Sequence, residues 1–263
     1  MTSTTGAPRK AVLWVLVGLV AMSCLYSLNR GPYRAWDGID GRDLNVFYTA
    51  SQAWFYGSNP YDSQNLYELF VGAGGNVAPG ASVNPPTTFV LLAPWAVLPW
   101  PMAVVVSIFL NVLLAAASVA TVMSLAHLRV SEPRGLLFLA FAFALASFHT
   151  SIAWGQLTIA ATALVVASLW GTVHDRPILS GVSIALAIAL KPQMGLIFLL
   201  LLLARRQSKA VFAAVAALGI IATVAAARLA IAAVDWLPTL ASNLAQFTQG
   251  GVATILSRRL PTR

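Results

Sequence analysis

Long stretches of apolar residues without a charged side chain are the feature that most limits how this chain can fold. Residues 101–127 form one such stretch and residues 155–172 another. A membrane-spanning helix needs about 20 mostly apolar residues, and a soluble core could not bury so many. Helices satisfy their backbone hydrogen bonds internally, as lipid requires. The sequence therefore predicts an all-α integral membrane protein with several spans, surrounded by membrane lipids.

Composition supports this interpretation. Charged residues make up 9% of the 263 residues, against roughly 25% in soluble domains. The net charge of +8 could indicate a nucleic-acid partner. However, the basic residues stand in short clusters between apolar stretches, as membrane topology requires, so we expect no nucleic-acid binding. The single cysteine, Cys24, excludes an intrachain disulfide and a metal site built from several cysteines.

The apolar stretches predict one transmembrane domain over residues 1–263 with about seven spans. We expect the first span at residues 11–28, then a polar loop at 29–86, a helical bundle at 87–233 and a polar tail at 234–263. The apolar stretches of the bundle are 87–98, 101–127, 135–151, 155–172, 177–190, 192–204 and 210–233.

Basic residues predict the orientation, because they concentrate in cytoplasmic loops. Arg9 and Lys10 place the N-terminus in the cytoplasm, so that the loop 29–86 lies outside. We therefore expect a multi-pass protein of the cytoplasmic membrane whose large loop and tail are extracytoplasmic. The further basic residues expected inside are Arg129, Arg134, Arg176, Arg205, Arg206 and Lys209.

Three segments depart from simple spans. Residues 87–98 are short and bracketed by prolines, which end helices, so they predict a re-entrant or interfacial helix. Lys191-Pro192 interrupts residues 177–204. This break favours a hairpin of two short helices with Lys191 at its outer crest over one tilted helix with a buried lysine, which would cost several kcal/mol unless paired. Residues 237–256 could form an interfacial helix.

The outer loop holds five of the chain's eight acidic residues, and Asp43 opens its most regular part. After Asp43, apolar residues recur at the spacing of an amphipathic helix, rich in the aromatics that collect at membrane interfaces. Gly57 and the residues after it end that helix with a turn. Asp43 could be the helix N-cap, or a catalytic carboxylate whose charge the helix dipole stabilises.

Other polar residues are expected on the same side of the membrane, namely Asn84, His149, Gln156 and Lys191. Lys191 could bind a lipid phosphate or extend to lipid headgroups. His149 could serve the site or be a packing histidine. The sequence has no phosphate-binding loop, metal-binding pattern or nucleophile elbow, so we expect no cofactor and no bound metal.

Five short motifs follow one another along the chain, namely Asp43 to Ala50, Gly57 to Tyr61, Asn84-Pro85-Pro86, Gly155-Gln156 and Lys191-Pro192. Taken in order, they resemble glycosyltransferase family 87, whose members have the GT-C membrane fold. The resemblance implies transfer of a sugar, typically mannose or arabinofuranose, from a polyprenyl-phosphate donor to an extracytoplasmic glycolipid or polysaccharide. It implies inversion at the sugar, and a GT-C-like bundle with an interfacial helix in the first outer loop.

The resemblance also implies that Asp43 is the general base. From their charge, polarity and place on the outer side, we expect Lys191, Arg42 and Gln156 to bind the lipid phosphate of the donor, although Arg42 could instead contact lipid headgroups. We expect Tyr48, Tyr61, Asn84 and His149 to contact the acceptor or support the loop.

The chain departs from the family pattern in three respects. Asn84 replaces a tyrosine, and Thr158 stands where the family has asparagine. Family members are also usually longer, which implies C-terminal truncation. The alternatives are an inactive family member that acts as a scaffold, and a transporter or flippase.

Overall fold

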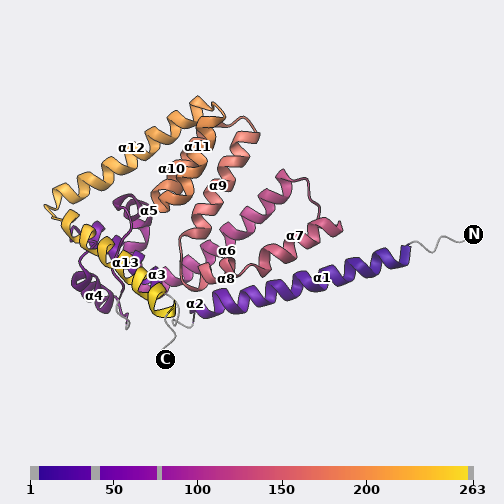
Figure 1. The fold of residues 1–263 in the computed structure, drawn as a ribbon, viewed down its shortest axis with the longest axis horizontal. Helices are drawn as coiled ribbons and strands as arrows, with labels where there is room; N and C mark the ends of the chain where they lie inside the picture. The colour runs from indigo at the N-terminus through magenta and orange to yellow at the C-terminus, as the bar shows by residue number, and fades with distance from the viewer. Residues whose placement is uncertain (1–5, 37–41, 76–78, 260–263) are drawn as a thin grey trace, which may run out of the picture. The chain divides into compact units, whose positions relative to one another are not determined.

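The structure is a computed structural model that describes residues 6–36, 42–75 and 79–259, with the backbone alone at 6–9, 42 and 250–259. Every element within these residues is helical, which confirms the all-α fold (Figure 1). The chain divides into two compact units, and each is described by itself. Unit 1 comprises Met1–Leu44 and Pro101–Ile220, and unit 2 comprises Asn45–Trp100 and Ile221–Arg263. The prediction of one transmembrane domain stays a prediction.

Unit 1 begins with a long apolar helix that packs along α7. Helix α1 (Gly6–Leu28) continues into a π-helical turn (Asn29–Tyr33) and α2 (Arg34–Trp36), and Figure 1 shows α1 beside α7. The hydroxyl of Ser27 donates a hydrogen bond to the Phe143 carbonyl of α7. The helices that follow are α6 (Trp100–Leu125), α7 (Pro133–Ala144) and α8 (Ala146–Ala153).

Three short apolar helices form the rest of unit 1 with the first part of α12 (Ser208–Ile231). They are α9 (Thr158–Val173), α10 (Pro177–Leu190) and α11 (Pro192–Ala204). Helix α10 packs between α9 and α11. The hydroxyls of Ser168 and Ser180 share a hydrogen bond of 2.9 Å between α9 and α10, because a polar group in an apolar interior needs a partner.

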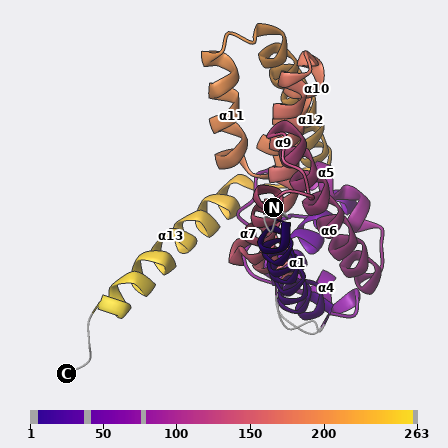
Figure 2. The same cartoon turned by 90° about the vertical axis from the view of Figure 1, so that its right-hand side faces the viewer.

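The predicted hairpin is confirmed, since α10 and α11 fold back on each other around Lys191 (Figure 2). Pro192 restricts the preceding residue to extended backbone, and Lys191 has φ −143° and ψ 90°. A Cβ atom on Gly195 would lie 2.5 Å from the Ile188 side chain, so glycine permits the close approach of α11 to α10.

Unit 2 contains most of α3 (Arg42–Tyr56), with α4 (Ser63–Gly72), α5 (Pro86–Ala96), the end of α12 and α13 (Leu237–Arg259). Asp62 caps α4 by accepting a hydrogen bond from the Gln64 backbone at 3.0 Å. Trp54 donates to the Ala225 carbonyl at 3.3 Å, which joins α3 to α12. The buried core consists of Ala50, Ala53, Trp54, Tyr61, Leu66, Phe89 and Leu229.

The helices coincide with the predicted apolar stretches, but the predicted number of about seven spans is not confirmed. By length and composition, Lys10–Trp36, Trp100–Leu125 and Ser208–Ile231 could each cross a membrane. The predicted span 135–151 is instead the pair α7 and α8, bent by 43°, which could supply a fourth. Helices α9, α10 and α11 are shorter, so within the described residues the structure supports three or four spans. Helices predicted at 87–98 and 237–256 are present as α5 and α13.

Candidate active site

Asp43 lies in the first turn of α3 and not at its N-cap, because the helix begins at Arg42. The next residue anchors this turn to the segment between α8 and α9: the Leu44 N–H donates to the Trp154 carbonyl at 3.2 Å. Gly155 has φ +64°, and a Cβ atom there would lie only 2.4 Å from the Leu44 Cβ. Glycine therefore allows the start of α3, and Asp43 with it, to lie against this segment.

The segment after Gly155 carries a connected set of polar side chains. The side-chain oxygen Oε1 of Gln156 accepts hydrogen bonds from the hydroxyls of Ser151 at 3.3 Å and Thr158 at 3.5 Å. The amide nitrogen of the Gln156 side chain makes no hydrogen bond to another residue in the described part of the chain. Gln156 is therefore held by its oxygen, and its N–H groups are able to donate to a ligand.

Lys191 joins this set from the break between α10 and α11. Its ammonium group donates to the Thr158 hydroxyl at 2.6 Å, and the side chain is half-buried. The ammonium also interacts electrostatically with the Asp43 carboxylate. Lys191 thus contacts polar side chains of unit 1.

Asp43, Gln156, Thr158 and Lys191 together form a polar cluster, which we call the Asp43–Lys191 cluster. The Asp43 carboxylate makes no hydrogen bond within the described residues, so its oxygens are open to a hydroxyl donor from a substrate. An ammonium group with an amide beside it suits an anionic group such as a phosphate. The arrangement can hold an anion and offer a base. The side chain of Arg42 lies outside the described residues.

His149 is buried on α8, in the packing between that helix and the end of α1. Tyr26 meets its ring edge-on at 5.2 Å, and the His149 backbone lies against Gly31. Arg30 and Arg34 are near enough to interact with it electrostatically. Its Nε2 atom is buried and has no hydrogen-bond partner among the residues that the structure describes. These contacts favour the packing interpretation of His149.

Tyr61 and Asn84 support unit 2 from inside. Tyr61 is fully buried, and its hydroxyl donates to the Asn84 carbonyl at 2.8 Å. Its ring stacks on Trp236 at 5.9 Å, and burial raises the pKa of its phenol far above the usual range. Asn243 of α13 donates to the Tyr61 carbonyl at 2.9 Å. Of the two roles expected for Tyr61 and Asn84, these contacts favour support of the loop.

Tyr48 lines a separate cleft of about 640 Å³ within unit 2. Its hydroxyl donates to the Leu98 carbonyl at 2.7 Å and accepts from Gln52 at 2.9 Å. Burial raises the pKa of the Tyr48 phenol, which keeps it a neutral donor. The Oε1 atom of Gln52 is buried and has no hydrogen-bond partner in the described part of unit 2, and Tyr56 exposes 62% of its surface. The other polar side chains of the cleft are Asn65 and Glu68.

Sequence reasoning missed two members of the polar network, Ser151 and Thr158. Thr158 differed from the family pattern, and its role depends on Lys191, 33 residues later. The available signal was its place two residues after Gln156, at the start of an apolar helix, where a hydroxyl can meet both neighbours.

An all-helical chain with three or four apolar spans and an internal polar cluster is a multi-pass membrane protein. The sequence model of glycosyltransferase family 87 matches residues 83–261. The chain therefore belongs to glycosyltransferase family 87, which makes it a membrane glycosyltransferase and confirms the resemblance drawn from its motifs. The match includes Gln156 and Lys191, whereas Asp43 precedes it. No curated protein and no solved structure matches the chain.

Proposed function

We propose that this glycosyltransferase moves a sugar, mannose or arabinofuranose, from a polyprenyl-phosphate donor to a glycolipid or polysaccharide outside the cytoplasmic membrane. One observation carries the proposal: the Asp43 carboxylate, the Gln156 amide and the Lys191 ammonium group collect in the Asp43–Lys191 cluster. A lipid-phosphate donor requires a cation for its leaving group and a base for the acceptor. The donor already carries its leaving group, so the step uses neither a metal nor a nucleotide.

In the proposed step, the Asp43 carboxylate removes the proton from an acceptor hydroxyl. The hydroxyl oxygen forms a bond to the anomeric carbon from the face opposite the phosphate. The bond between that carbon and the phosphate oxygen breaks, its electrons leave with the polyprenyl phosphate, and the sugar inverts. Lys191 stabilises the phosphate charge, the Gln156 amide donates to it, and Arg42 assists. Asp43 later releases its proton to water.

Replacement of Asp43 by asparagine tests the base. Asn keeps the size of the side chain and cannot accept the proton, so the transfer rate should fall by about 10²–10⁴, the usual contribution of a general base. The measurement is sugar transfer in membranes, from radiolabelled polyprenyl-phosphate mannose and arabinofuranose in separate assays. Glu132→Gln, the same chemical change beside α7, should leave the rate unchanged. A wild-type rate in Asp43→Asn would contradict the base assignment, and a wild-type chain inactive with both donors would favour the scaffold.

The cleft of unit 2 has the volume of a small-molecule site, and we propose that it binds part of the acceptor glycan. Its amides, its Glu68 carboxylate and the exposed Tyr56 ring suit sugar hydroxyls and the apolar face of a sugar. Tyr56→Ala should raise the acceptor KM about tenfold and leave the donor KM unchanged. Tyr67→Ala, also an exposed tyrosine but not part of this cleft, is the matched control. Equal acceptor KM values for the two variants would exclude the assignment.

A further inference from the structure

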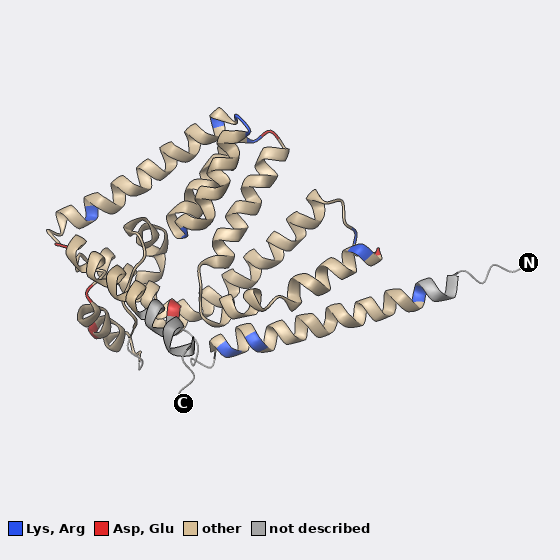
Figure 3. Cartoon of the chain, viewed as in Figure 1, with Lys and Arg blue, Asp and Glu red and all other residues tan. Residues whose placement is uncertain are grey.

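Two turns of unit 1 meet at one end of its short helices and form a polar cleft. One turn joins α9 to α10, and the other joins α11 to α12. The cleft between them has a volume of about 410 Å³. Its charged side chains are Asp175, Arg176, Arg206 and Lys209. Three positively charged side chains and one negatively charged side chain therefore line the cleft. Figure 3 shows blue Lys and Arg segments at the turn between α11 and α12.

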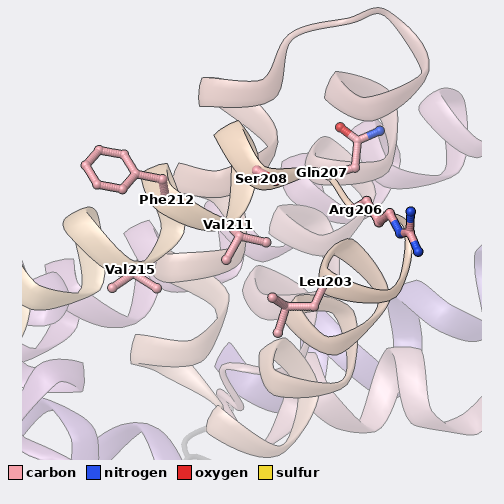
Figure 4. Close-up of a pocket in the computed structure, with 7 residues that line it drawn as sticks. All are labelled: Leu203, Arg206, Gln207, Ser208, Val211, Phe212 and Val215. Carbon is pink, nitrogen blue, oxygen red and sulfur yellow. The ribbon is translucent and has the colours of Figure 1, made fainter.

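A second, mostly apolar cleft adjoins the first. It has a volume of about 310 Å³ and lies where α11 passes into α12, and Arg206, Gln207 and Ser208 line both clefts. Figure 4 shows Leu203 and Val211 facing the space between the two helices, with Arg206 at the rim. The remaining walls, Phe212 and Val215, are exposed apolar side chains. A basic cleft thus continues into an apolar one.

We propose that unit 1 binds a membrane phospholipid with an anionic headgroup, its phosphate in the basic cleft and an acyl chain in the apolar cleft. The excess of positive charge complements such a headgroup, and basic pockets between membrane helices recognise anionic lipids in this way. Arginine and lysine also donate several hydrogen bonds to phosphate oxygens. The apolar walls suit a lipid and not a free phosphate, because only a lipid has an acyl chain to place against them.

The site is distinct from the Asp43–Lys191 cluster. Arg176 precedes the 14-residue helix α10 and Lys191 follows it. At 1.5 Å per residue, the helix separates the two sites by ~21 Å. A donor whose phosphate lay beside Arg176 would hold its sugar far from Lys191, so the occupant of the basic cleft is a structural lipid and not the sugar donor.

Native mass spectrometry of the purified full chain tests the proposal. The probes are phosphatidylglycerol and phosphatidylcholine with identical acyl chains, and we expect at least fivefold more phosphatidylglycerol to remain bound. The combined variant Arg176→Gln, Arg206→Gln and Lys209→Gln should lose this preference. The control Lys10→Gln, Arg129→Gln and Arg134→Gln removes the same charge elsewhere in unit 1 and should keep it.

Two further arms keep the test decisive if the charge variant does not fold. Val215→Trp leaves every charge in place and fills the apolar cleft, so it should lower phosphatidylglycerol retention at least threefold. Glycerol phosphate, which lacks acyl chains, should not displace the lipid at equal concentration. Displacement by glycerol phosphate, equal retention of both lipids or an equal loss in the control variant would overturn the proposal.

Discussion

Lys191 occupies the break between two apolar helices, where a cation needs a polar partner. The Thr158 hydroxyl supplies that partner by accepting from the ammonium group at 2.6 Å and donating to the Gln156 oxygen at 3.5 Å. Thr158 thereby orients both groups that we expect to meet the donor phosphate. A residue that differs from the family pattern thus lies at the centre of the candidate site.

Substitution of Thr158 tests this orientation. Thr158→Val keeps the side-chain shape and removes the hydroxyl, so the donor KM should rise about tenfold, the equivalent of ~1.4 kcal/mol, which is within the net contribution of a typical hydrogen bond. Thr158→Ser should restore most of the affinity. Lys191→Met should raise the donor KM further, by removing the charge itself, and the acceptor KM should change little in each variant.

A double-mutant cycle separates orientation from general damage. If Thr158 acts through Lys191, the Thr158→Val change should have little further effect on donor KM in a Lys191→Met background. Additive effects would show that the two residues act independently. Lowered stability with an unchanged donor KM would give Lys191 a purely structural role.

Three residues of the cluster were predictable from short motifs, whereas Thr158 and the connections between the four residues were not. Asp43, Gln156 and Lys191 could each be named from position, charge and resemblance. The hydrogen bond from Lys191 to Thr158 depends on how α9 packs against α10, which local spacing does not express. The same limit applies to His149, for which the sequence left a site role and a packing role open. Its packing against Tyr26 and Gly31 is a contact with residues far away in the sequence, which local spacing does not reveal.

At the scale of the elements, Gly155 controls where α3 begins relative to the turn between α8 and α9. Any Cβ at Gly155 would meet the Leu44 Cβ at 2.4 Å, so the first turn of α3 would have to move, and Asp43 with it. We expect Gly155→Ala to reduce transfer at least tenfold, because a misplacement of about 1 Å can cost that much in rate. The measurements are the transfer rate and the melting temperature of each variant.

Gly74→Ala is the matched control, since Gly74 also has a positive φ, of +89°, but nothing lies within 4 Å of its added Cβ. Alanine in a left-handed backbone conformation should lower the free energy of unfolding by about 1 kcal/mol in both variants. Activity should fall only in Gly155→Ala. If both lose activity equally, backbone strain and not the displacement of α3 is the cause.

Hydrophobic spacing predicted where helices occur more reliably than where they are interrupted. The amphipathic pattern after Asp43 predicted α3, and Gly57, with φ +87°, ends it as expected. The bend between α7 and α8 falls at Leu145, where no proline or glycine signals a break. Helix α4 was missed although Asp62 caps it, because its apolar residues lie within a polar loop.

At the scale of the whole chain, the orientation in the membrane stays a prediction that rests on where positive charge lies. Lys191 and the turns at 174–176 and 205–207 lie at opposite ends of the α10–α11 hairpin. Positive charge collects in cytoplasmic turns, which predicts that these two turns face the cytoplasm and Lys191 the outside. Helices α9 to α11 are shorter than a full span, so their depth in the membrane depends on packing rather than on length.

Cysteine labelling tests this orientation directly, because the chain has a single native cysteine to remove. In a Cys24→Ser background, Glu68→Cys on α4 should react with a membrane-impermeant maleimide added to intact cells. Ser131→Cys and His174→Cys, both exposed positions in turns of unit 1, should react only after the membrane is permeabilised. Labelling of Ser131→Cys and His174→Cys in intact cells would reverse the topology and place Lys191 in the cytoplasm. The donor would then have to be reached from the inner leaflet, while the chemistry of the Asp43–Lys191 cluster would stay the same.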